Sequence, residues 1–138
     1  MNEKDFTEMI NKAFIPFLKD LGFIMDSQNI SGKFYKVSFS DSTHKVNIAY
    51  EPSEKERLFV VIFRINSPLS EFDNRSKSPS LSNLNSLFMN QISTDQRVLN
   101  DDYFKNIEIK DEDGKLMLKT AKELRLVLPK YLDSLKLK

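Results

Sequence analysis

The residues that could do chemistry are few, and they form no recognisable catalytic motif. The chain has a single histidine, His44, and no cysteine. As a general base, a histidine needs a proton within hydrogen-bond reach and usually an orienting carboxylate. The nearest acid upstream, Asp41, is separated from His44 by an expected turn. We therefore interpret His44 as a strand-edge histidine, keep it as the candidate residue of a ligand site, and predict no catalytic residue.

Metal and cofactor sites are not predicted either. Without cysteine, the chain can form no disulfide, no thiolate zinc or iron–sulfur site and no cysteine nucleophile. Residues 111–114 have the composition of the middle of a calcium loop. The first and last positions of that loop would be Ile109 and Thr120, which supply no carboxylate. The three glycines stand alone, which argues against a glycine-rich phosphate loop. We expect no metal and no cofactor.

The segment of residues 66–80 is the strongest candidate for a binding site. It shows no periodicity, and loops of about 15 residues are uncommon inside compact domains unless they have a function. Aromatic and arginine side chains are the types that commonly anchor protein interfaces. The alternative is a connector whose Leu69 and Phe72 pack on the core. The residues that we predict to bind a partner are Glu71, Phe72, Asp73, Arg75 and Lys77.

Charge and hydropathy argue against nucleic acid and membranes as partners. Lys and Arg number 21 against 20 Asp and Glu, so the net charge is +1, whereas nucleic-acid binders carry a clear basic excess. The longest apolar run, residues 58–63, is far shorter than the ~20 residues that span a membrane. We also expect no signal peptide. These features predict a cytoplasmic protein whose partner is another protein.

The elements that must position these residues begin with a helix. The 138 residues suffice for one domain, and we predict a single domain over residues 1–138. Apolar side chains recur at helical spacing over residues 5–21. Pro16 removes a backbone donor inside this pattern and is expected to kink the helix near Lys12. Gly22 marks its end.

Four short strands are predicted after this helix. They are expected at residues 23–27, 34–39, 44–50 and 58–65. Residues 28–32 are expected to form a turn, and the close spacing of the strands favours an antiparallel meander. The last strand is apolar on both faces. If no helix covers Leu58, Val60 and Ile62, these residues form an exposed stripe, and we expect a homodimer through them.

The second half of the chain is predicted to be partly helical. Ser80 can cap a helix, and residues 93–102 read as a loop. Residues 104–120 allow two interpretations. They form either a hairpin with a turn at Asp113 and Gly114, or the approach to one long helix that begins near Glu112. We favour the long helix because its apolar stripe is unbroken, although Pro129 should kink it.

The order of these elements resembles that of small bacterial immunity-type proteins, which neutralise the toxins of polymorphic toxin systems. The resemblance covers most of the chain by layout and is carried by residues 17–23, the strands up to Ile65 and the apolar stripe of residues 116–132. It implies a toxin as partner and assigns no functional residue. The layout is also similar to the type III secretion chaperone fold, which would use the hairpin and whose members are typically acidic.

Together, these patterns predict an α+β domain with a four-stranded antiparallel meander sheet packed against N-terminal and C-terminal helices. The helices should cover the sheet face that includes Val46 and Ile48. The expected function is that of a non-enzymatic protein-binding module, in its most concrete form an immunity-type protein. Two alternatives stay open. One is a type III secretion chaperone-like protein, and the other is a small-ligand-binding domain or an enzyme with a site between sheet and helices.

Overall fold

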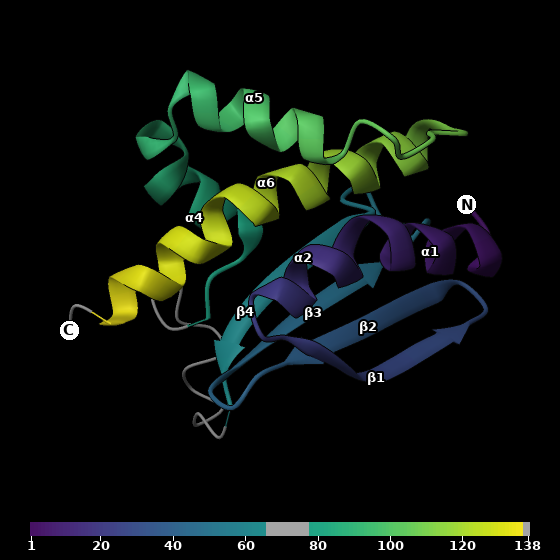
Figure 1. Ribbon diagram of the computed structural model, residues 1–138. Coiled ribbons are helices and arrows are strands. Elements are labelled where there is room, and N and C mark those ends of the chain that lie inside the picture. Colours follow the sequence, from purple (N-terminus) through teal and green to yellow (C-terminus); the bar gives the residue numbers. More distant parts are fainter. Residues whose placement is uncertain (66–77, 137–138) are drawn as a thin grey trace.

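The computed structural model describes residues 1–65 and 78–136 of the chain. Its four strands form one antiparallel sheet, and the helices lie over one face of that sheet (Figure 1). The long C-terminal helix runs across the sheet beside the N-terminal helices, and a further helix lies outside it, remote from the sheet (Figure 1). The fold is therefore α+β, as predicted.

The N-terminal helix is continuous but changes its winding around Pro16. It consists of α1 (Glu3–Met9), the π-helical turn η1 (Ile10–Phe14) and α2 (Ile15–Asp20). Proline cannot donate to the carbonyl one turn before it, and a π turn is one way in which a helix accommodates such a defect. The irregularity falls around Lys12, where the sequence predicts a kink. Gly22 then ends the helix with a φ of +94°, which favours glycine.

The sheet has the predicted strand order, with one boundary that differs. Its strands are β1 (Ile24–Ser31), β2 (Phe34–Ser40), β3 (His44–Tyr50) and β4 (Leu58–Arg64), paired in sequence order. The predicted turn at residues 28–32 is wrong, because β1 continues through most of it and pairs with β2 as far as Ser31. The turn lies at Gly32, where φ is +59°. Polar residues can occupy β1 because it is an edge strand of the described sheet.

The helices cover the sheet face that the sequence indicates. Val46 and Ile48 are fully buried in the core that the helices form with the sheet. Val60 and Ile62 are also buried, and Leu58 packs against the same core. The sequence predicts a homodimer through these three residues only if no helix covers them, and that condition is not met, because they pack into the core that the helices of their own chain form with the sheet. On β4 it is Phe59, with the opposite side-chain direction, that is exposed.

The described part of the second half of the chain contains a helix that the sequence does not predict. Its elements are α4 (Leu81–Phe88), the 3₁₀ turn η2 (Met89–Gln91), α5 (Thr94–Tyr103) and α6 (Glu112–Lys136). The long helix is confirmed and contains Pro129, so the hairpin over residues 104–120 is wrong. The predicted loop at residues 93–102 is also wrong, since most of it is α5. The hydroxyl of Ser93 accepts a hydrogen bond from the amide of Gln96, whose side chain accepts one from the Ser93 amide, which closes a capping box.

Candidate partner-binding surface

Helix α5 presents its large apolar side chains to solvent. Val98, Leu99 and Tyr103 are 60%, 70% and 40% exposed, whereas the buried residue of this helix is polar, Asn100 at 1%. A surface helix normally buries its apolar stripe and exposes its polar face. In α5 that arrangement is reversed, so the helix offers an apolar surface that its own chain does not cover among the described residues.

Asn100 explains how such a helix stays attached. Its Nδ2 donates a hydrogen bond to the backbone carbonyl of Lys122 at 3.0 Å, and its Oδ1 accepts one from Nη1 of Arg125 at 2.7 Å. Both partners belong to α6, on which α5 packs. At the end of α5, Phe104 is buried and meets Phe17 of α2 edge to face, with ring centroids 6.2 Å apart. A polar clamp and one aromatic anchor thus replace an apolar stripe.

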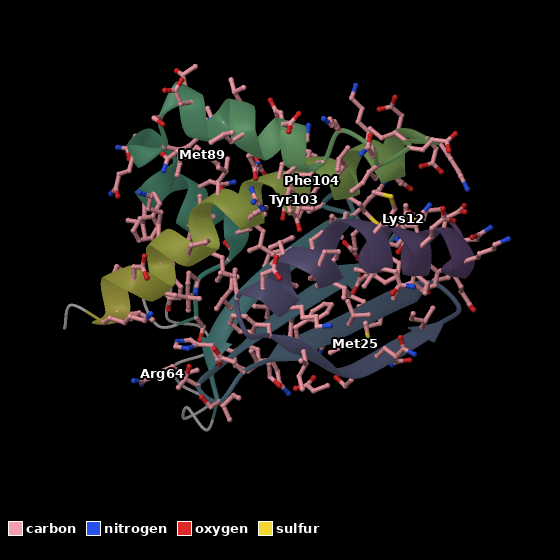
Figure 2. All side chains as sticks on the ribbon, viewed as in Figure 1. Lys12, Met25, Arg64, Met89, Tyr103 and Phe104 are labelled. Atoms are coloured by element: carbon pink, nitrogen blue, oxygen red, sulfur yellow. The ribbon has the colours of Figure 1, made fainter. Side chains whose placement is uncertain are left out.

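Arg125 also organises the exposed aromatic ring of the helix. Its guanidinium carbon lies 3.9 Å from the centroid of the Tyr103 ring, within the range of a cation–π contact. The Tyr103 ring is further held edge to face against Phe104, at 4.9 Å between centroids. Figure 2 shows Tyr103 and Phe104 where α5 meets α6. Tyrosine and arginine are the residue types that most often dominate binding energy. We call Val98, Leu99, Tyr103 and Arg125 the outer α5 face.

A groove runs along the other flank of α5, between this helix and α6. Its volume is about 520 Å³, and its lining includes Met89, Leu118 and Leu126 together with several lysines of α6. Figure 2 shows Met89 beside the start of α5, at one end of this region. Volumes of this order suit small ligands and short peptide segments. We call this groove the α5–α6 groove. It lies beside the outer α5 face, and its lining does not include Tyr103.

His44 lies at the start of β3 in a buried structural setting. Its Nδ1 lies 2.8 Å from the hydroxyl of Thr43, and its ring meets Tyr131 of α6 edge to face. The Asp41 carboxylate accepts the backbone N–H groups of Thr43 and His44 and so forms the turn before β3. It also accepts from the Thr43 hydroxyl at 3.1 Å, so its hydrogen-bond link to the ring runs through Thr43. The Nε2 atom is buried and has no hydrogen-bond partner among the residues that the structure describes. Burial lowers the pKa of His44 below its ordinary value, which keeps the ring neutral.

Asp113 is the centre of a polar cluster at the start of α6. Its carboxylate accepts a short hydrogen bond from the Tyr50 hydroxyl and another from Nη1 of Arg57 at 3.1 Å. The hydrogen bond from Tyr50 is the main cause that lowers the pKa of Asp113, while burial and the same bond raise that of Tyr50. Asp111 caps the helix by accepting the Gly114 amide at 2.7 Å. Asp113 therefore ties the start of α6 to the sheet. No cluster of side chains in the described ranges could hold a metal ion.

The predicted binding loop cannot be compared with these sites. Glu71, Phe72, Asp73, Arg75 and Lys77 all lie outside the described residues, so their role stays a prediction. The outer α5 face was not predicted from the sequence. The signal that could have found its helix is the spacing of Ser93 and Gln96, a serine followed three residues later by glutamine.

Comparison with protein family models, with curated proteins and with solved structures finds no match to this chain. None of the helices within the described part of the chain combines the length and apolar character needed to cross a membrane. Function must therefore be argued from the surface of the molecule itself.

Proposed function

We propose that this chain is a non-enzymatic protein-binding module and that the outer α5 face is its binding surface. The observation that carries the proposal is the reversed polarity of α5, which exposes Val98, Leu99 and Tyr103 while it buries Asn100. Contiguous exposed apolar side chains are typical of interaction sites. Burying one leucine side chain stabilises a complex by about 1.5–3 kcal/mol before ordering costs.

The pre-ordered tyrosine supports a protein partner in particular. Stacking by Arg125 and contact with Phe104 hold the Tyr103 ring in place before any partner arrives. A side chain that is already ordered loses less conformational entropy on binding. Acidic residues flank the apolar ones on the same helix, including Asp95 and Asp102. Charges around an apolar centre are the usual arrangement of a specific interface.

The most concrete form of this function is an immunity-type protein that binds and neutralises a bacterial toxin. It is supported by the layout of helix, antiparallel meander and closing helices. The chaperone-like alternative depends on a hairpin in residues 104–120, but this part of the chain is helical from Glu112 onwards. A ligand site or enzyme with a site between sheet and helices would use the hollow between β4, α4 and α6, which has a volume of about 300 Å³ and includes Val60, Asn85 and Lys119 in its lining.

The test is capture of the partner by matched variants of the tagged chain. The binding variant combines Leu99→Ser with Tyr103→Ala. The control is Ile24→Ser, which removes an equally exposed side chain (67%) from β1. Lysate of the native organism is passed over each variant, and eluates are quantified by mass spectrometry. We expect one stoichiometric partner on the wild type and the control, and a loss of at least about tenfold on the binding variant.

Equal capture by the binding variant, with its fold confirmed by circular dichroism, would refute the outer α5 face as the binding surface. The immunity form has its own test. Expression of the captured partner alone should stop cell growth, and co-expression of the wild-type chain should restore it. A partner that is harmless when expressed alone would contradict the immunity form and leave the binding module standing.

A further inference from the structure

The α5–α6 groove has an apolar floor and a basic rim. Its lining includes the buried Leu118 and the half-buried Met89 and Leu126. Around them lie four cationic side chains and two carboxylates. The cationic side chains are Arg97, Lys115, Lys119 and Lys122.

The charges of this rim do not cancel. Lys122 pairs with Asp101 across the groove at 3.3 Å. Arg97 donates to the backbone carbonyl of Met89 at 2.9 Å, so its contact leaves the positive charge uncompensated. Lys115 and Lys119 are exposed and form no ion pair with any described residue, which leaves Glu123 as the single acid opposite three cations. The rim therefore carries a positive excess in a chain whose net charge is only +1.

The spacing of the charges indicates what kind of ligand fits. Lys115 and Lys119 are one helical turn apart, and the lining of α6 extends from Lys115 to Leu126. This stretch is about 16 Å long at 1.5 Å per residue. A single anionic head group would use one end of such a row, whereas a peptide can place several carboxylates along it and apolar side chains on the floor between them.

We propose that the α5–α6 groove binds a short acidic segment of the partner protein, with apolar side chains interspersed among its carboxylates. This inference rests on the proposed protein-binding function and adds the chemistry of the segment that is bound. The outer α5 face supplies the apolar anchors beside the groove, and the basic rim selects the partner by charge.

The experiment selects peptides of about 12 residues, which span roughly 18 Å as a helix, from a random display library on the immobilised wild-type chain. Selected peptides are then measured by fluorescence anisotropy on two variants of equal charge. The groove variant is Lys115→Glu with Lys119→Glu. The control is Lys4→Glu with Lys33→Glu, which changes two exposed lysines outside the groove.

We expect the enriched peptides to be acidic with at least two large apolar residues. They should bind the groove variant at least about tenfold more weakly and the control within about twofold of the wild type. The proposal is overturned if no peptide is enriched over an unrelated immobilised protein, if the enriched peptides are neutral or basic, or if the groove variant binds them unchanged. Binding of dodecanoate in the groove without peptide enrichment would likewise overturn it in favour of a lipid anion.

Failure of this inference is distinguishable from failure of the proposed function. If the native partner is captured through Leu99 and Tyr103 while the Lys115→Glu/Lys119→Glu variant captures it equally well, the groove proposal is refuted and the binding module stands. If acidic peptides require Lys115 and Lys119 but capture of the native partner does not depend on Leu99 and Tyr103, the groove is supported and the outer α5 face is refuted.

Discussion

Replacing Asn100 by alanine removes the polar clamp that holds α5 on α6. The side chain is buried, donates to the Lys122 carbonyl at 3.0 Å and accepts from Arg125 at 2.7 Å. A neutral hydrogen bond contributes about 0.5–1.5 kcal/mol to stability and a bond to a charged group about 1.5–3 kcal/mol. Because the guanidinium of Arg125 is partly exposed and regains water, we expect the lower half of the summed range, about 2–3 kcal/mol.

Two measurements on the purified Asn100→Ala variant check this expectation. Urea unfolding gives the loss in the free energy of unfolding, and amide hydrogen exchange reports whether residues 94–103 lose protection before the rest of the chain. The control is Asn106→Ala, since Asn106 is exposed, and its effect should stay within about 0.5 kcal/mol. A loss below about 1 kcal/mol for Asn100→Ala, with α5 amides still protected, would refute the clamp.

Three further predictions concern the rest of the fold and are measured by urea unfolding. Burial lowers the pKa of His44 from its ordinary value of 6.5. The contribution of His44 to stability is therefore present above pH 6.5 and is lost as the pH falls through the folded pKa. His44→Gln should flatten this dependence of the free energy of unfolding on pH. The pKa of Asp113 is lowered from 3.8, so its contribution is lost only as the pH falls below that value; Tyr50→Phe should cost about 1–2 kcal/mol at pH 7 and weaken this acid dependence. Pro129→Ala should raise the free energy of unfolding by about 1–2 kcal/mol, because alanine restores a backbone donor inside α6. An unchanged free energy of unfolding would mean that the helix already accommodates proline.

The sheet could be predicted where one face of a strand is apolar. Strand β3 was predicted at residues 44–50 and is observed with those bounds, because Val46, Ile48 and Tyr50 alternate with more polar residues. Strand β1 was cut short because most of its second half is polar. The second half of β1 is held by backbone pairing with β2, for example of Gln28 with Val37. No side-chain pattern in β1 predicts this pairing.

The sequence does not predict α5 because its apolar residues are exposed, and the same exposure makes α5 a candidate binding site. Apolar spacing predicts a helix when its apolar residues face the core. In α5 the buried residue is Asn100, whereas Val98, Leu99 and Tyr103 face solvent. Its clamp joins Asn100 to Lys122 and Arg125, more than 20 residues away, and such a contact appears only after folding. By contrast, the sequence predicts α6 because its apolar residues recur at helical spacing, and in the structure these residues are buried in the core.

The most direct test of the central claim is amide hydrogen exchange of the wild-type chain with and without its purified native partner. We predict slower exchange on binding in α5 and in the part of α6 around Arg125, with the exposed face of the sheet around Phe59 unchanged. Protection confined to that sheet face, with α5 exchanging at its free rate, would contradict the claim that the outer α5 face binds the partner.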